Sequence, residues 1–312
     1  MTPPIAVVFP GQASQYVGMG KTLYDNSQAA RELYQFASDT LGEDIARISF
    51  NGPIETLRRT RFTQPAILTH SLAVLAIVGD ALPSAQVTAG HSLGEYGALV
   101  LAGSLTAHDA IRLVILRAQL MEQASQASRG TMAAVLGMEL TTLEEICRSV
   151  ATTGIVVPAN INSTGQIAIS GEVKAVEEAG RIAKERGAKR VIMLEVGGAF
   201  HSPLMRSAQE GMRTALKDVP IAAPQTTFIP NVSATPEANP DRIRELLVEQ
   251  ITAPVRWLDT MGQLKRRGVK TVIEVGPGAV LVGFAKRDVA PETCVSLDTW
   301  DNLQEIALST TA

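Results

Sequence analysis

The sequence predicts an α/β fold in which a parallel sheet covered by helices carries an inserted ferredoxin-like subdomain. Apolar runs of strand length alternate with helical stretches from Ile5 to Ala124, and this alternation is typical of a parallel sheet. After the linker 123–130, which is rich in small polar residues, the rhythm changes. Residues 132–196 then follow the order β-α-β-β-α-β, which is the ferredoxin-like order.

The first part of the chain opens with an apolar run, 5–9, that predicts the first strand. A second strand over 85–89 leads into a helix over 93–103, which has an apolar face. The helix over 106–124 begins with Thr106 as its cap and an acid, Asp109, three residues later. These elements predict the first half of a helix-covered parallel sheet.

The predicted insert has its own succession of elements. Its strands cover 132–136, 155–162, 166–170 and 190–196. We expect Thr142 to cap a first helix that runs to Val150, and a second helix to cover 173–186. The turn 163–165 is short enough to join two antiparallel strands. The insert is therefore expected over 128–197, between two stretches of catalytic core, 1–127 and 198–312.

The chain returns to the core at Gly197 and Gly198. Ser202 followed by Pro203 is a good helix start, because serine caps the first turn and proline fits inside it. We expect a helix to Leu216, a strand over 228–232, a helix over 241–251 and a strand over 272–275. The segment 276–278, Gly-Pro-Gly, is too short for a phosphate loop and is interpreted as a turn.

Composition limits the possible functions. The chain has 312 residues, of which 46% are hydrophobic and 19% charged, and a net charge of −3. This balance predicts a globular protein with no pull toward nucleic acid or an anionic membrane. No segment approaches the ~20 apolar residues of a membrane span, and the N-terminal segment does not resemble a signal peptide. Cys147 and Cys294 suit neither a disulfide framework nor zinc, so we expect the cytoplasm and no metal.

The segment Gly90–Gly94 is the strongest functional signal. Its pattern, Gly-x-Ser-x-Gly between a strand and a helix, is typical of a nucleophile elbow, in which a sharp turn exposes the serine hydroxyl. The same string also arises as an ordinary turn of small residues. Ser92 is therefore a candidate nucleophile that needs support from other residues.

A serine nucleophile needs a base, and His201 is the best candidate. It follows two glycines at the junction between insert and core and precedes a helix cap. A structural histidine is the alternative for this position. We assign a structural role to His91, because its side chain leaves the turn in another direction. No Asp or Glu presents itself as a third member of a triad, so a carbonyl group would orient the imidazole.

Arg117 lies in an apolar stripe of the helix over 106–124. Its neighbours one turn away are Leu113, Val114, Leu120 and Met121. Such a side chain either extends to the surface or meets a buried anion. Because no acid shares its face of the helix, the cation is left unpaired, as a site for a ligand carboxylate requires.

The segment Phe9-Pro10-Gly11-Gln12 follows the first strand, where parallel sheets place their ligand loops. A backbone amide there and that of Leu93 would together form an oxyanion hole. By itself this tetrapeptide predicts only a loop.

Several short motifs occur together from one end of the chain to the other. They are 9–12 (FPGQ), 63–66 (TQPA), 90–95 (GHSLGE), Arg117, 162–166 (NSTGQ), 170–171 (SG), 199–202 (AFHS), 231–232 (NV), Gln250, 254–257 (PVRW) and 274–278 (EVGPG). In order and spacing this set resembles the malonyl-CoA:acyl carrier protein transacylases, acyltransferases of fatty acid and polyketide synthesis. Three residues depart from the pattern: Ala13 and Ala118 stand where glycine is usual, and Ala279 where lysine is common.

The resemblance implies an α/β-hydrolase-like core with a ferredoxin-like insert and a function in lipid metabolism. It implies that a malonyl group passes from malonyl-CoA, through a serine ester, to the thiol of an acyl carrier protein, without a cofactor; we expect a monomer. It also implies a role for each site residue. Ser92 would be the nucleophile, His201 the general acid and base, and Arg117 the clamp for the malonyl carboxylate. The backbone amides of Gln12 and Leu93 would form the oxyanion hole, and a carbonyl of Gln250 would orient His201. Gln64, Asn162 and Phe200 would line the site, and the Phe200 ring would crowd an α-methyl branch.

Other functions stay open at this point. A hydrolase that clears acyl groups from carrier proteins would use the same serine and histidine, although Arg117 argues against it. A trans-acting acyltransferase of a polyketide synthase would share the whole site. A non-catalytic module that docks carrier proteins would form no acyl-enzyme at all.

Overall fold

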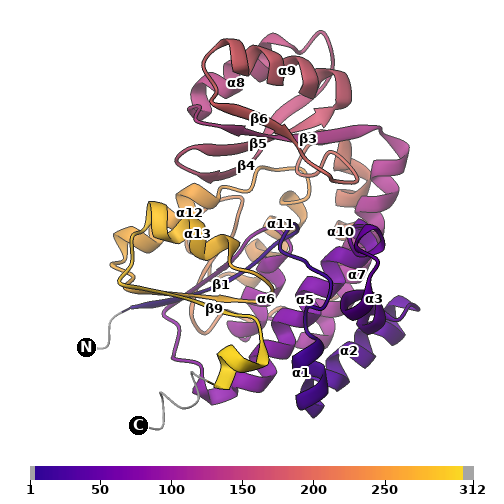
Figure 1. The fold of residues 1–312 in the computed structure, drawn as a ribbon, viewed down its shortest axis with the longest axis vertical. Coiled ribbons are helices and arrows are strands. Elements are labelled where there is room, and N and C mark those ends of the chain that lie inside the picture. The colour runs from indigo at the N-terminus through magenta and orange to yellow at the C-terminus, as the bar shows by residue number, and fades with distance from the viewer. Residues whose placement is uncertain (1–3, 305–312) are drawn as a thin grey trace.

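The computed structural model describes residues 4–304 and contains two separate sheets (Figure 1). The larger sheet has five parallel strands in the order β7-β2-β1-β8-β9. Its strands are β1 (Ile5–Phe9), β2 (Val87–Gly90), β7 (Thr227–Ile229), β8 (Thr271–Val275) and β9 (Thr293–Leu297). Because β1 and β2 are neighbours and parallel, the segments that follow them lie at the same edge of the sheet.

Helices cover both faces of this sheet. Successive strand residues point to opposite faces, so Val7 and Phe9 belong to one apolar core whereas Ala6 and Val8 belong to another. The second core is closed by α12 (Trp257–Arg266) and α13 (Val280–Asp288). The first core is larger and includes side chains from α1 (Lys21–Asn26), α2 (Gln28–Leu41), α3 (Ile45–Asn51), α4 (Ile54–Leu57), α5 (Thr60–Val78), α6 (Gly94–Leu101), α7 (Ala107–Ala127), α10 (Arg206–Leu216) and α11 (Pro240–Glu249).

The smaller sheet lies at one end of the molecule, at the top of Figure 1. It consists of β3 (Gly130–Leu136), β4 (Val156–Ser163), β5 (Gln166–Glu172) and β6 (Arg190–Met193) in the order β4-β5-β3-β6, with every pair antiparallel. Helices α8 (Leu140–Ser149) and α9 (Val173–Glu185) pack on it around a core of its own. This is the strand order of a ferredoxin-like unit, and the predicted fold class is confirmed.

Some predicted boundaries are wrong. Thr142 does not cap α8, since Glu139 precedes the helix and Leu140 begins it. The strand expected over 190–196 ends at Met193, because the backbone turns after Leu194: the N–H of Val196 bonds the carbonyl of Leu194 instead of a neighbouring strand. Thr106 does cap α7, accepting a hydrogen bond from the backbone N–H of Asp109 at 3.0 Å.

Helix α5 is long and apolar enough to cross a membrane, and within the described residues it alone meets that criterion. The expectation that no segment approaches such a length is therefore wrong. Of the apolar window in this helix, however, 78% is buried inside the fold. The helix is apolar because it lies in the main core, between α2 and α7, and Gln64 is a buried polar side chain near its beginning.

Candidate active site

The chain turns sharply between β2 and α6, and this turn carries Ser92. A Cβ atom at Gly90 would lie 1.9 Å from the backbone of Gly94, and one at Gly94 would lie 2.2 Å from the carbonyl oxygen of Phe9. Only glycine fits at either position. Ser92 itself has a φ of 53°, a left-handed conformation that L-residues rarely adopt. The geometry is that of a nucleophile elbow rather than of an ordinary turn.

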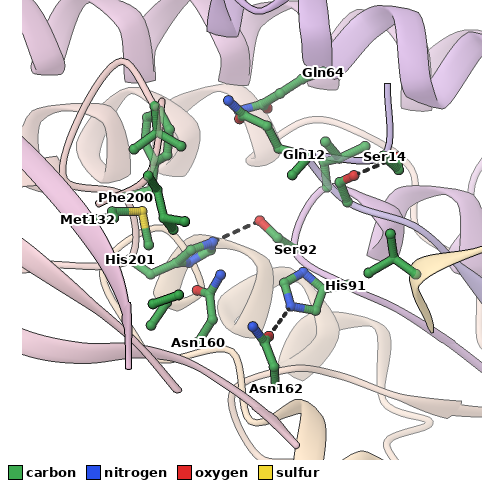
Figure 2. Close-up of a pocket in the computed structure, with 18 of the residues that line it drawn as sticks. Gln12, Ser14, Gln64, His91, Ser92, Met132, Asn160, Asn162, Phe200 and His201 are labelled. Atoms are coloured by element: carbon green, nitrogen blue, oxygen red, sulfur yellow. Dashed lines mark hydrogen bonds between the residues drawn. The ribbon is translucent and has the colours of Figure 1, made fainter. Parts of the chain in front are cut away.

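His201 lies directly opposite Ser92 (Figure 2). Its Nε2 is 2.8 Å from the Ser92 Oγ, and its Nδ1 is 2.8 Å from the backbone carbonyl oxygen of Gln250. Because a carbonyl can only accept, Nδ1 carries the proton, and Nε2 is free to accept the proton of the hydroxyl. Burial and, to a smaller extent, the nearby charge of Arg117 together lower the pKa of His201 to about 3. The imidazole is therefore neutral at physiological pH.

Arg117 is fully buried in the middle of α7 and points to the same place. Its Nη1 donates to the Oε1 of Gln64 at 2.5 Å, and its Nη2 donates to the Ser92 Oγ at 2.9 Å and to the Oε1 of Gln250 at 3.0 Å. The cation is therefore not left without partners, as its helix face alone had indicated. Its partners are neutral, however, and within the part of the chain that the structure describes Nε has no acceptor. The guanidinium keeps its charge and a free donor.

Two buried polar residues for which the sequence suggested no role, Glu95 and Asn231, hold Gln250 and the Ser92 turn in place by hydrogen bonds. Glu95, which is 1% exposed, accepts hydrogen bonds from the backbone N–H of Asn231 and from the Nε2 of Gln250. Asn231 in turn accepts the backbone N–H of Ser92 at 2.7 Å through its Oδ1. Burial raises the pKa of Glu95 to about 8, against the opposing effects of these bonds and of Arg117. The sequence signals for this arrangement were a carboxyl in the otherwise apolar helix α6 and the presence of both residues in the motifs 90–95 and 231–232.

The backbone amides of Gln12 and Leu93 lie at the carboxyl ends of β1 and β2, and both residues line the same cavity. Neither amide forms a hydrogen bond with any described residue. Two unpaired N–H groups beside a nucleophile are what an oxyanion hole requires. The adjacent Ala13 has a φ of 83°, so the alanine occupies a conformation that favours glycine.

We therefore expect Ala13→Gly to stabilise the protein. A left-handed φ costs an L-residue about 1–2 kcal/mol, and the extra freedom of glycine in the unfolded chain takes back about 0.4–1 kcal/mol. The net gain in the free energy of unfolding is about 0.5–1 kcal/mol, measurable by urea denaturation. Ala13→Ser keeps the Cβ atom and should gain nothing. A lower stability for the glycine variant would contradict the argument.

These residues surround a cavity of about 190 Å³. Of the residues predicted for the site, only Gln250 lies behind the wall; the others line it, namely Gln12, Gln64, Ser92, Leu93, Arg117, Asn162, Phe200 and His201. The insert supplies the facing wall with Met132, Asn160 and Asn162 (Figure 2). His91 bonds Asn162 across this gap, Nε2 to Oδ1 at 2.9 Å, so this histidine helps to join the two units.

The site contains no set of metal ligands. Within residues 4–304, no cluster of three or more His, Cys, Asp or Glu side chains could hold a metal ion. The chemistry that the arrangement supports is nucleophilic attack by Ser92, with His201 as base and Arg117 available to an anionic group.

Known proteins share this fold and much of this sequence. Residues 6–302 match the acyl transferase domain family. The chain is 45% identical over 284 residues to a malonyl CoA-acyl carrier protein transacylase of Bacillus subtilis, a match that covers 91% of this chain and 90% of the relative. It is 39% identical over 296 residues to the transacylase of that name from Escherichia coli (strain K12), covering 94% and 95% of the two chains.

Solved structures agree. The acyl-carrier-protein S-malonyltransferase of Bartonella henselae superposes with a TM-score of 0.93 at 40% identity, covering 99% of this chain and all of the other. A malonyl-transacylase solved in complex with its type II PKS acyl-carrier protein superposes with a TM-score of 0.92 at 37% identity, covering 98% of this chain and 99% of the other. The chain therefore belongs to the acyl transferase domain family, among the malonyl-CoA:acyl carrier protein transacylases.

Proposed function

We propose that this protein transfers the malonyl group of malonyl-CoA to the phosphopantetheine thiol of an acyl carrier protein through an ester on Ser92. The observation that carries the proposal is the meeting of three groups at one point. The Ser92 Oγ lies 2.8 Å from the Nε2 of His201 and 2.9 Å from the Nη2 of Arg117. A hydroxyl, a neutral imidazole and a fixed positive charge are what transfer of an anionic acyl group needs.

In the first half-reaction the Ser92 oxygen attacks the thioester carbonyl carbon and its proton moves to the Nε2 of His201. The C–S bond then breaks, and the departing thiolate of CoA takes the proton from His201. In the second half-reaction the carrier thiol gives its proton to His201 and attacks the ester, and Ser92 leaves with that proton. The Gln250 carbonyl, 2.8 Å from Nδ1, holds the imidazole in the required tautomer throughout. General base help of this kind is worth on the order of 10²–10⁴ in rate.

The amides of Gln12 and Leu93 are the proposed donors to the oxyanion. Both are unpaired within the described residues and both belong to cavity-lining residues. Each donor of this kind contributes on the order of 10²–10³ in rate.

Arg117 is the proposed clamp for the malonyl carboxylate, because its buried Nε lacks an acceptor in the described part of the chain. Gln64 holds the guanidinium by accepting a hydrogen bond from its Nη1. Phe200 and Asn162 are the proposed lining residues, and the Phe200 ring would crowd an α-methyl branch.

The wider assignments are also proposals. The insert spans 128–197 and interrupts a catalytic core made of 1–127 and 198–312. Every proposed site residue comes from this one chain, so a monomer would suffice for activity. Both cysteines are free thiols, which suits the reducing cytoplasm. The proposed macromolecular partner is the carrier protein, with no role for nucleic acid or a membrane.

The low pKa of His201 predicts an unusual pH profile. Since the neutral imidazole is the active form and its pKa is about 3, against an ordinary 6.5, acylation of Ser92 by malonyl-CoA should continue undiminished as the pH is lowered from 8 to about 5. A histidine of ordinary pKa would lose more than about 90% of the rate over that range. Single-turnover acylation followed by quenched-flow mass spectrometry measures this. A midpoint near the ordinary value would refute it.

Stability should change over the same pH range although the rate does not. Below about pH 6.5 the unfolded chain takes up a proton at His201, and the folded chain does not until about pH 3. The contribution of His201 to the free energy of unfolding therefore falls as the pH is lowered through this window. His201→Gln removes this contribution, so its stability should fall less steeply with pH than that of the wild type.

The central test of the proposal is to incubate the protein with malonyl-CoA and to measure the mass of the intact protein by mass spectrometry. We expect an adduct of the mass of one malonyl ester, which disappears when a holo carrier protein is added and reappears as malonyl carrier. An adduct that passes only to water would identify a hydrolase. The absence of any adduct would identify a non-catalytic module.

A further inference from the structure

Glu95 is a buried carboxyl group that takes no part in the transfer proposed above. It lies in α6, one turn beyond Ser92, and is 1% exposed. A buried carboxyl is costly unless hydrogen bonds compensate it. The contacts of Glu95 therefore indicate what it does, on the premise that the proposed function holds.

Both oxygens of Glu95 accept hydrogen bonds from groups that hold the active site. Oε1 accepts from the backbone N–H of Asn231, whose side chain in turn accepts the backbone N–H of Ser92. Oε2 accepts from the Nε2 of Gln250 at 2.5 Å. One carboxyl group thus fixes the segment that holds the nucleophile turn and the side chain of Gln250.

The contact with Gln250 decides which way its amide faces. Its Nε2 donates to Glu95 and also to the backbone carbonyl of Ser92 at 2.9 Å. With its nitrogen engaged on that side, the amide turns its oxygen toward Arg117, and Oε1 accepts from Nη2 at 3.0 Å. If the amide were reversed, its NH₂ group would face the guanidinium of Arg117. Both groups are hydrogen-bond donors, so no hydrogen bond could form between them.

The amide also separates the carboxyl from the guanidinium. Among the described residues no acidic side chain forms an ion pair with Arg117. A carboxylate bonded directly to Arg117 would occupy the donors that a ligand carboxylate needs. Gln250 gives the guanidinium an oriented neutral acceptor. A ligand carboxylate can displace this acceptor with a smaller loss of free energy than it would need to displace a bonded carboxylate.

We propose that Glu95 is a positioning residue for acyl-group selectivity: it orients the Gln250 amide so that Arg117 is held in place by a neutral oxygen and stays available to the malonyl carboxylate. Glu95 does not touch the substrate and acts through Gln250. Removing it should impair the use of malonyl-CoA more than that of acetyl-CoA, because only the malonyl group depends on Arg117.

The test is Glu95→Gln, which keeps the shape but offers only one acceptor oxygen in place of two. The measured quantity is the ratio of kcat/KM for malonyl-CoA to that for acetyl-CoA, with wild type alongside. We expect the ratio to fall about tenfold, as for the loss of one hydrogen bond to a charged group, and mainly through the KM for malonyl-CoA. The matched control is Glu274→Gln, a buried carboxyl on β8 that accepts the backbone N–H of Val282 at 2.8 Å.

Both variants should lose stability, but only Glu95→Gln should lose the malonyl preference. If both lose stability and both keep the wild-type ratio, Glu95 is a structural residue and the proposal is wrong. A wild-type protein that shows no malonyl transfer would instead refute the proposed function. The two failures are therefore distinguishable.

A second variant covers the case in which Glu95→Gln does not fold. The double substitution Glu95→Gln with Gln250→Glu exchanges the amide and the carboxyl, so an N–H···O bond between the two positions is kept, while the bond from position 250 to the backbone carbonyl of Ser92 is lost. The carboxyl at position 250 then pairs directly with Arg117. We expect a folded protein that binds malonyl-CoA at least about tenfold more weakly, as for competition at a charged hydrogen bond. A wild-type malonyl preference in this variant would overturn the proposal.

Discussion

Ser92→Ala is expected to abolish the covalent intermediate and nearly all transfer. The Ser92 Oγ is the atom that meets both the His201 Nε2 and the Arg117 Nη2 in the described site, and alanine removes it. In a comparable hydrolase, loss of the nucleophile costs on the order of 10⁶ in kcat. We expect a fall of at least about 10⁴, measured as malonyl carrier formed per minute, and no malonyl mass on the variant.

The fold should survive this change, because Arg117 keeps its bonds to Gln64 and Gln250 when the hydroxyl is lost. Ser170→Ala is a matched control, since Ser170 is a fully buried serine on β5 that does not line the cavity. It should keep the adduct. A malonyl adduct on Ser92→Ala would mean that the nucleophile lies elsewhere and would refute the proposed mechanism.

Features that depend on neighbouring residues could be predicted from the sequence. The turn at Ser92 is such a case, because Gly90 and Gly94 exclude a Cβ atom within a span of five residues. The insert is another, since its six elements follow one another along the chain and build one sheet and its core. Local periodicity and turn residues carry that information.

Bonds between distant segments could be predicted only where the family resemblance named both partners, as for His201 with Ser92 and with the Gln250 carbonyl. Glu95 accepts from Asn231 and Gln250, which lie 136 and 155 residues further along the chain. No periodicity reports such a contact. For the same reason the partners of Arg117 were misjudged: its own helix face carries no acceptor, but Gln64 on α5 and Gln250 after α11 supply two. The left-handed φ of Ala13 was indicated only by the family pattern, in which glycine is usual at this position, because alanine itself does not signal it.

Arg117→Ala is expected to remove the preference for malonyl over acetyl groups while leaving transfer of neutral acyl groups in place. The guanidinium is fully buried and has one donor without an acceptor in the described chain, so a malonyl carboxylate would form a charge-assisted bond there. Such a bond is worth about 1.5–3 kcal/mol, which corresponds to roughly a ten- to hundredfold preference. Competition between malonyl-CoA and acetyl-CoA for one enzyme sample measures the ratio directly.

Two control variants distinguish the loss of the carboxylate-binding donors from the loss of packing volume and from the loss of positive charge. Arg117→Met fills most of the vacated volume, so it should lose the same preference with less loss of stability than the alanine variant. Arg117→Lys keeps a positive charge but not the planar fork, so it should hold its acceptors poorly and restore only part of the preference. In the two uncharged variants the pKa of His201 should also rise, because the charge of Arg117 is one cause of its low value. Unchanged malonyl-to-acetyl ratios in both uncharged variants would show that selectivity arises elsewhere in the cavity.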